Sequence, residues 1–272
     1  LVPKSAALAD GGHVVVWASS QTGNWDVYAQ RYDINGQKVG GEFRVNNTTY
    51  NQQGYHGIST GVPNLDVTGL SGGGFVVTFA GNTGASNSWE IFARRYDATG
   101  TALANETVVN SNLTGTQMVP QTASLADGGY VIAWASEGQD GGGNGVYAQR
   151  YNSEGVAQGS EFRVNQLTAG NQGSRAVTNG YEEGLSVTGL QGGGFAVTWY
   201  SDALGNGDIY TRIYRADGSA RSGELLVNTT VADGQWLPQV AALANGDFLV
   251  TWAGGDASGY GVFAQRLGAD GG

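Results

Sequence analysis

The phrase GGGFVVTFAG at residues 72–81 returns as GGGFAVTWYS at residues 192–201. Looser copies begin at Gly11, Gly128 and Gly246, so the motif occurs five times in the chain. Internal repetition constrains a fold more than any other sequence feature, because each repeat is a supersecondary unit that needs its neighbours to bury its faces. The chain is therefore predicted to be a series of five similar units.

Each unit reads as four short strands, A to D. Strand A (5–9, 121–126 and 239–244) ends at an Asp-Gly or Asn-Gly turn, which is a hairpin signal. Strand B is the repeated phrase itself, and its aromatic residues are predicted to be core. Strand C is predicted at 26–33, 90–97, 145–152, 208–215 and 261–268. Strand D is predicted at 42–46, 106–110, 161–165 and 224–228, and the fifth unit has none.

These units predict an all-β fold, a five-bladed β-propeller of four-stranded antiparallel blades in which the last blade lacks its outer strand. A long β-sandwich is the alternative, but it does not predict such regular four-strand units. We expect one domain over residues 1–272, with blades near 1–49, 50–113, 114–170, 171–232 and 233–272. Either the last blade is three-stranded or the natural protein continues past Gly272.

The connections between strands predict which face of the propeller binds a ligand. The A–B and C–D turns are short and nearly uniform, whereas the B–C and D–A loops are long and differ between blades. In an antiparallel blade these two groups of connections lie on opposite faces. Because variable loops on a rigid scaffold usually carry function, we predict that the B–C and D–A loops form the functional face.

Aromatic and acidic residues in these loops indicate a sugar site. An exposed ring can cover the apolar face of a pyranose while neighbouring carboxylates and amides bond its hydroxyl groups. The predicted ligand-binding residues are Trp25, Asp26, Trp89, Glu90, Tyr260, Trp236, Tyr55, His56 and Tyr181. The alternative is that the loop rings fold down onto their own blades.

Two Gly-rich loops, EGQDGGGNG and SDALGNGD, are candidates for calcium, which takes six to eight oxygen ligands. The predicted ligands are Asp140, Asn144, Asp202 and Asp208. The alternative is that these residues only form turns.

Other residues recur at fixed places and are predicted to be structural. The sets are Gln52, Gln117, Gln172 and Gln235 in the D–A loops, Asn46, Asn110, Asn165 and Asn228 after strand D, and Arg31, Arg95, Arg150 and Arg266 in strand C. The strand C residue that alternates between Gln and Arg, together with alternating D–A lengths, indicates that a two-blade unit was duplicated.

Composition and motifs exclude several classes of function. The net charge of −10 argues against binding nucleic acid or anionic lipid, no apolar run could span a membrane, and the absence of Cys removes thiol chemistry. His56 with nearby Tyr could serve a polysaccharide lyase, and Glu182 with Glu183 a glycosidase, but adjacent side chains diverge in a strand. No catalytic triad, zinc spacing or phosphate loop appears, so the chain is not expected to be an enzyme.

The segment LADGGYVIAWASEGQDGGGNGVYAQRYNSEGVAQGSEFRVN at residues 125–165 resembles the repeats of very large bacterial RTX-type calcium-binding surface proteins and adhesins. Similar phrases extend the resemblance over nearly the whole chain. The resemblance implies a secreted or cell-surface bacterial protein, export by type I secretion, and calcium in the parent protein.

The function that we predict from the sequence is a carbohydrate-binding, lectin-like module whose partner is a glycan or another cell-surface ligand. The alternative is a structural or protein-interaction propeller without sugar specificity. A polysaccharide lyase or glycosidase is the lesser alternative.

Overall fold

The structure is a computed structural model that describes residues 3–21, 23–49, 51–54, 64–84, 88–177, 180–231, 233–256 and 259–272. Within these ranges the chain forms strands, turns and loops and no helix. Accordingly, the described residues contain no helix that is long and apolar enough to cross a membrane.

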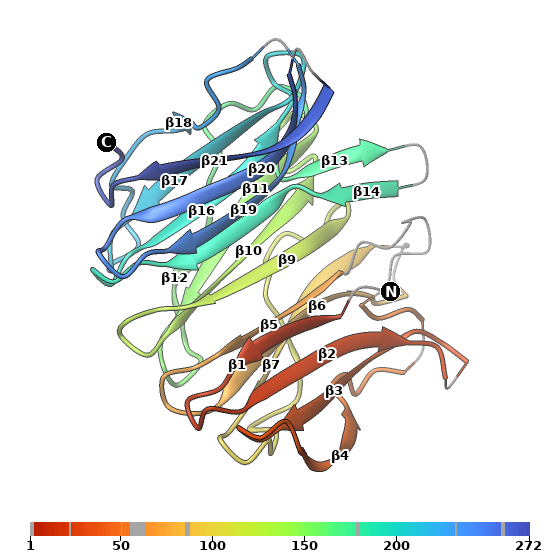
Figure 1. Ribbon diagram of the computed structural model, residues 1–272. Coiled ribbons are helices and arrows are strands. Elements are labelled where there is room, and N and C mark those ends of the chain that lie inside the picture. Colours follow the sequence, from red (N-terminus) through yellow and green to blue (C-terminus); the bar gives the residue numbers. More distant parts are fainter. Residues whose placement is uncertain are drawn as a thin grey trace.

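Apart from one two-stranded hairpin, the strands of the described residues form five antiparallel sheets that follow one another along the chain (Figure 1). The first sheet contains β1 (Lys4–Ala7), β2 (His13–Ser19), β3 (Asp26–Tyr32) and β4 (Lys38–Arg44). The second contains β5 (Leu65–Gly69), β6 (Phe75–Asn82), β7 (Trp89–Tyr96) and β8 (Thr107–Val108). The third contains β9 (Gln117–Ser124), β10 (Tyr130–Glu137), β11 (Asn144–Tyr151) and β12 (Ala157–Arg163).

The fourth sheet contains β15 (Leu185–Gly189), β16 (Phe195–Ser201), β17 (Asp208–Tyr214) and β18 (Leu225–Leu226). The fifth contains β19 (Gln235–Ala242), β20 (Phe248–Asp256) and β21 (Gly259–Leu267), without a fourth strand. The prediction of a five-bladed β-propeller with a three-stranded last blade is confirmed, and the sheets are called blades 1 to 5 below.

One element was not predicted. The long segment before blade 4 forms a separate hairpin of β13 (Ser174–Val177) and β14 (Gly180–Glu183). Figure 1 shows this hairpin on the same side of the molecule as the N-terminus. It brings residues of a D–A connection, the class of loop predicted to carry function, close to the inner strands.

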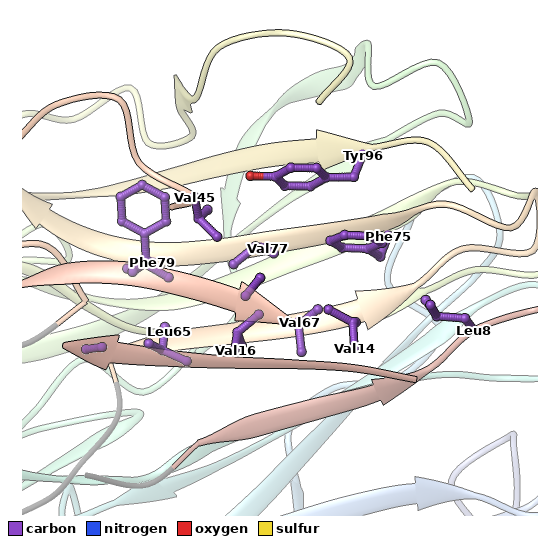
Figure 2. Close-up of a cluster of buried hydrophobic side chains, with 13 residues drawn as sticks. Leu8, Val14, Val16, Val45, Leu65, Val67, Phe75, Val77, Phe79 and Tyr96 are labelled. Atoms are coloured by element: carbon purple, nitrogen blue, oxygen red, sulfur yellow. The ribbon is translucent and has the colours of Figure 1, made fainter. Parts of the chain in front are cut away.

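The core consists of layers between successive blades. Phe75, Val77 and Phe79 of β6 pack on Val14 and Val16 of β2, and all five side chains are buried (Figure 2). Comparable clusters join blades 2 and 3, blades 3 and 4, and blades 4 and 5. The alternating strand B phrase explains this arrangement, because successive side chains point to opposite faces of a sheet and both faces meet a neighbour.

Inner strands β1, β5, β9, β15 and β19 meet in chain order around a common axis. Asn64 and Asp66, from β5 and the residue before it, accept hydrogen bonds from the backbone N–H groups of Val119 (2.8 Å) and Thr122 (2.7 Å). Ser186 Oγ of β15 likewise accepts from Val240 N of β19 at 3.1 Å. Polar side chains at the axis therefore join one blade to the next.

Candidate functional site at the propeller axis

Three polar side chains from different parts of the chain meet at the axis. Lys4 Nζ of β1 lies 2.7 Å from Glu183 Oε1, at the end of the β13–β14 hairpin. Gln121 Nε2 of β9 donates to the same carboxylate oxygen. The side chains of Lys4 and Glu183 keep 22% and 14% of their accessible surface, so the ion pair is only partly buried.

A β-bulge positions Gln121 in this group. The register of β9 against β10 shifts between Ala133 and Ala135, and Val119 at the bulge adopts a φ of +48°. A β-branched residue rarely adopts this left-handed conformation, and bulges commonly redirect the side chains that follow. Pro120 then leads into Gln121.

Asp66 of β5 adds a second carboxyl group to the axial cluster. The residue is partly exposed, although protein surrounds its carboxyl group. Burial raises the pKa of Asp66 to about 7, against the lowering effects of Lys4 and of the hydrogen bond from Thr122, and Glu183 raises the pKa further. Lys4 and Glu183 both act on Asp66 electrostatically, so we define the axial cluster as Lys4, Asp66, Gln121 and Glu183.

The internal repeat shows that the fold does not need a carboxylate at position 66. The segment LDVTGL at 65–70 matches LSVTGL at 185–190, so Ser186 is the counterpart of Asp66. Both side chains accept a backbone hydrogen bond from the following blade. A serine hydroxyl is thus enough to make the structural hydrogen bond. The carboxyl group of Asp66 is therefore not needed for that bond.

Lys4 is a similar local departure from the repeat. Lys4, Gln121 and Gln239 each follow a proline at the start of strand A, and only the first is charged. Lys4 thus has an ammonium group at a position where blades 3 and 5 have the amide of a glutamine, and this ammonium group pairs with Glu183. Axial charge therefore varies between blades whose backbones are equivalent.

The two carboxyl groups have opposite environments. Asp66 has a raised pKa and holds a proton near neutral pH, whereas Glu183 meets an ammonium group and an amide donor. A protonated carboxylic acid can donate a proton, and an ionised carboxylate can accept one or stabilise a positive charge. A carboxyl group with a raised pKa beside a second carboxyl group is an arrangement that general acid catalysis uses.

The predicted aromatic residues fall into two groups. Trp89 is 6% exposed and belongs to the core between blades 2 and 3, so it offers no exposed ring, and Trp25 packs against the core of blades 1 and 2. Trp236 and Tyr260 instead come together in blade 5, in an edge-to-face pair with centroids 5.4 Å apart. Tyr260 is 87% exposed, so this pair is an aromatic surface of the kind predicted.

Four acidic residues that were predicted to bind a ligand or a metal ion, in the B–C loops or at the start of strand C, bond to the asparagine that follows strand D. Asn46, after strand D, accepts from Val27 N at 2.7 Å and donates to Asp26 Oδ1 at 2.6 Å, and Asp26 is fully buried. The other blades with a strand D repeat this clamp, in the pairs Asn110–Glu90, Asn165–Asp140 and Asn228–Asp208. Burial raises the pKa of Glu90, and its bond from Asn110 opposes the shift.

The remaining predicted calcium ligands also bond to nearby loops. Asn144 Nδ2 donates to Ser174 Oγ at 2.7 Å, and Asp202 Oδ2 accepts from Asn171 Nδ2 at 3.1 Å. Among the described residues no three His, Cys, Asp or Glu side chains gather in a group that could hold a metal ion. Calcium binding stays a prediction.

Three predicted residues cannot be placed in the site. Tyr55 and His56 lie outside the described residues, and for Tyr181 the structure describes the backbone in β14 but not the side chain.

The recurrent glutamine needs a correction of register. The residue equivalent to Gln172 is Gln53, because each forms an isolated bridge to the end of strand B and each is buried, whereas the prediction named Gln52. The predicted structural role fits the amide bonds, for example those of Gln172 Nε2 to Ala169 O at 2.8 Å and of Gln235 Nε2 to Asp233 O at 2.9 Å.

Sequence reasoning missed Lys4, Asp66 and Gln121, and it set Glu183 aside as one of two diverging neighbours. The signal was present in the repeat, where Asp66 replaces Ser186 and Lys4 replaces a glutamine. Where one repeat carries a charged residue and another carries a neutral one at the same position, the fold does not require the charge. The convergence of four separate segments required the structure.

Comparison with known proteins identifies the fold. No family model and no curated protein matches the chain. Among solved structures, the endo-arabinase from Bacteroides thetaiotaomicron is similar over 93% of this chain and 89% of its own, with a TM-score of 0.53 and 12% identity. The Penicillium chrysogenum α-L-arabinanase solved with arabinobiose covers 98% and 80%, with a TM-score of 0.59 and 13% identity.

A protein of unknown function from Dyadobacter fermentans is similar to the same degree, with a TM-score of 0.60, 9% identity and coverage of 98% and 78%. At these identities the likeness concerns the fold. The sequence expectation that the chain is not an enzyme is nevertheless overturned, because several of its structural neighbours are glycoside hydrolases.

Proposed function

We propose that this protein acts on glycans and hydrolyses glycosidic bonds at the axial cluster. The observation that carries the proposal is the pair of carboxyl groups at the axis, Asp66 and Glu183, one with a pKa raised to about 7 and the other bonded to an ammonium group. The predicted lectin-like function is replaced by one in which binding precedes cleavage.

The proposed roles follow from the environments. Protonated Asp66 donates its proton to the glycosidic oxygen, so that the leaving sugar departs as an alcohol. Glu183 stabilises the positive charge that develops on the sugar and either attacks its anomeric carbon or takes a proton from an attacking water. Lys4 and Gln121 hold the Glu183 carboxylate in place from two different blades.

Two further observations support the proposal. The axial cluster lies where the inner strands begin, on the face of the D–A connections, and the variable loops of this face can form a wall around a glycan. The structural neighbours include an arabinanase with bound arabinobiose and a family-43 glycoside hydrolase of the same fold.

The test is the release of reducing ends from arabinan, xylan and related polysaccharides. We expect Asp66→Ser, which copies Ser186, and Glu183→Gln to lower the rate by about 100-fold or more, because loss of a general acid or base costs 10²–10⁴ in rate. Glu154→Gln, in a C–D turn on the opposite face, is the matched control and should keep full activity. Cleavage that persists in both axial variants would place the chemistry elsewhere.

The Trp236–Tyr260 pair favours a second candidate, namely sugar binding at the edge of blade 5. The large exposed ring of Tyr260 suits stacking on a sugar ring, and Tyr also carries a hydroxyl that can bond to sugar hydroxyls. A glycan array with the folded protein tests it, and Tyr260→Ala should weaken the array signal while leaving axial hydrolysis in place.

A further inference from the structure

The four blade–blade interfaces follow one rule. The face of strand B that carries aromatic residues packs on the preceding blade, as Phe248, Val250 and Trp252 of blade 5 do on Ile209 and Ile213 of blade 4. The opposite face of each blade packs on the following blade. A blade with no neighbour on one side therefore exposes a face of known type.

Blade 5 exposes the face that would meet a following blade. Val262 of β21 is 83% exposed and Ala264 is also exposed. The counterparts of Val262 in the other four blades are each 0% exposed: Val27, Ile91, Val146 and Ile209. No buried hydrophobic cluster of the described residues joins blade 5 to blade 1.

Blade 1 exposes the complementary face. His13, Val15 and Trp17 of β2 occupy the positions of Phe75, Val77 and Phe79 in blade 2, but they remain partly exposed whereas those three are buried. Two stacked pairs lie on this face, His13 with Tyr32 at 4.8 Å and Trp17 with Tyr28 at 6.3 Å, and of these four side chains only Tyr28 is buried. In the other interfaces a face of this aromatic type packs on the aliphatic face of the preceding blade, and blade 1 has no preceding blade.

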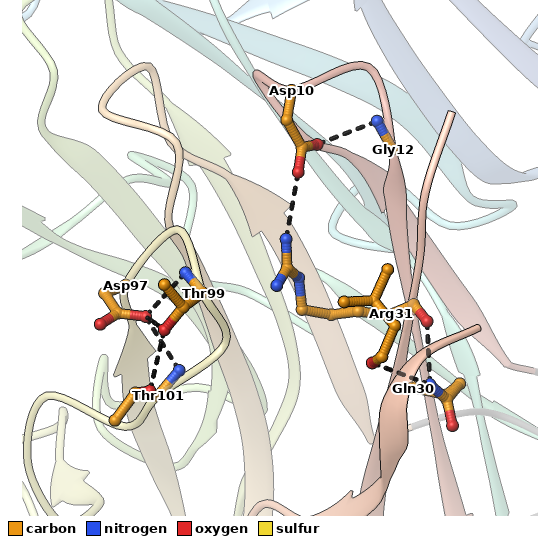
Figure 3. Close-up of polar contacts among 8 residues, drawn as sticks. Asp10, Gly12, Gln30, Arg31, Asp97, Thr99 and Thr101 are labelled. Carbon is orange, nitrogen blue, oxygen red and sulfur yellow. Dashed lines mark hydrogen bonds and ion pairs between the residues drawn. The ribbon is translucent and has the colours of Figure 1, made fainter. Parts of the chain in front are cut away.

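A polar contact matches the same pattern. Arg31 of β3, which also bonds to Asp10, lies over the C–D turn of blade 2, where its Cδ is 2.8 Å from the position that a Cβ would take on Gly100 (Figure 3). Arg95 and Arg150 lie in the same way over Gly155 and Gly218 of the next blades.

In blade 5 the arginine has no following turn to contact, and in blade 1 the C–D turn has no preceding arginine over it. Arg266 of blade 5 is bonded to Asp247 of its own blade, as Arg31 is to Asp10, but its side chain is 61% exposed, against 7% for Arg31. Gly36, in the C–D turn of blade 1, has no heavy atom within 4 Å of the position that a Cβ would take.

We infer that a second copy of this chain docks head to tail, with the exposed face of blade 5 in one copy against the aromatic face of blade 1 in the other. Arg266 then lies over the Gly36 turn of the neighbouring copy. The occupant is a copy of this chain because the two uncovered faces are the halves of an interface that the chain already builds four times. Such a heterologous contact forms a closed ring or a filament, and the inference is independent of the proposed hydrolysis.

Sedimentation velocity over a range of concentrations tests the contact with variants at each face. We expect the wild type to associate, and Val262→Glu and Val15→Glu each to sediment as monomers at concentrations where the wild type associates. An equimolar mixture of the two variants should form a dimer and nothing larger, because each variant keeps one intact face. Leu204→Glu, at a loop residue that is 72% exposed, is the control and should associate like the wild type.

A monomeric wild type at all concentrations, or a mixture that stays monomeric, would overturn the inference. Loss of association in one face variant only would also overturn it. If Val15→Glu fails to fold, the absence of native cysteine offers a second measurement. Arg266→Cys mixed with Asn35→Cys should then cross-link as a heterodimer faster than either variant cross-links with itself, and equal rates would contradict the head-to-tail arrangement.

Discussion

Asp66 is the residue of the axial cluster whose pKa is shifted most clearly by its surroundings. Its carboxyl group accepts a backbone hydrogen bond and lies near both an ammonium group and a second carboxylate, yet burial dominates and raises its pKa from the ordinary value of 3.8 to about 7. A carboxylic acid that keeps its proton near neutral pH is suited to proton donation. The same shift ties the stability of the fold to pH.

The first prediction concerns that link. Because folding raises the pKa of Asp66, the native state binds this proton more tightly than the unfolded chain does, so the contribution to stability is full below about pH 4 and is lost as pH rises to about 7. Urea denaturation of Asp66→Ser at several pH values should lack this part of the decline. Parallel curves for the wild type and the variant between pH 4 and 7 would contradict the assigned shift.

The second prediction concerns activity. If protonated Asp66 donates to the leaving group, the rate of hydrolysis should fall as pH rises through about 7, because the acid form is lost. Initial rates from pH 5 to pH 9 measure this limb. A rate that stays constant to pH 9 would remove Asp66 from the role of general acid.

At the scale of the strand, the Asn clamp explains why blade ends repeat so regularly. In four blades an asparagine after strand D accepts from the backbone at the start of strand C and donates to an acidic residue that lies there or, in blade 3, in the preceding B–C loop. One side chain thus satisfies a backbone donor and a carboxylate, which is required when both are buried. Blade 5 has no strand D and no such asparagine.

Removing one clamp should be costly. The Asn228 amide lies 2.7 Å from both the backbone N of Ile209 and the Asp208 carboxylate, and Asn228→Ala removes both bonds. We expect the free energy of unfolding to fall by about 3 kcal/mol. Thermal and urea denaturation measure it, with Asn35→Ala in an exposed turn as the control. Equal stability of the two variants would show that the clamp adds nothing.

Strand patterns and turns could be predicted from the sequence because each is local. The phrase beginning at Gly72 fixes a buried two-sided strand, and the Asp-Gly turns fix the hairpins. The two-residue lengths of β8 and β18 were not predicted, and nor were the bonds of Arg94 and Arg212 in the same blades to carbonyls of the preceding blade. The role of Asp26 was misjudged because its partner Asn46 lies 20 residues away.

At the scale of the whole molecule, blades 2, 3 and 4 are each joined to the preceding blade by a glutamate at strand D. Glu106 Oε1 accepts from Asn47 N at 2.8 Å, and Glu161 and Glu224 make the same kind of bond to backbone N–H groups at Ser111 and Gln166. Glu42 is their counterpart in blade 1, and among the described residues its recorded bond is a 3.5 Å contact from Gln21. The ring of contacts is therefore open at blade 1.

This difference predicts an asymmetry between equivalent glutamates. Glu224→Ala should lower the free energy of unfolding by about 1 kcal/mol, because it removes a charge-assisted bond between blades. Glu42→Ala should stay within about 0.5 kcal/mol of the wild type at concentrations where the chain is monomeric. Equal losses in the two variants would mean that blade 1 has a neighbour in the monomer.

The axial cluster belongs to this scale as well, which is why the sequence could not predict it. Lys4 and Glu183 are 179 residues apart, and only the arrangement of the inner strands around the axis brings their charged atoms within 2.7 Å. The face on which they lie could be predicted from loop lengths, but their meeting could not.

The most direct measurement is a crystal structure of Glu183→Gln with an arabino- or xylo-oligosaccharide. The account predicts sugar density over the axis, with a glycosidic oxygen within hydrogen-bonding distance of Asp66. Sugar bound only on the Trp236–Tyr260 pair, with the axis free of sugar at saturating ligand, would contradict an axial catalytic site.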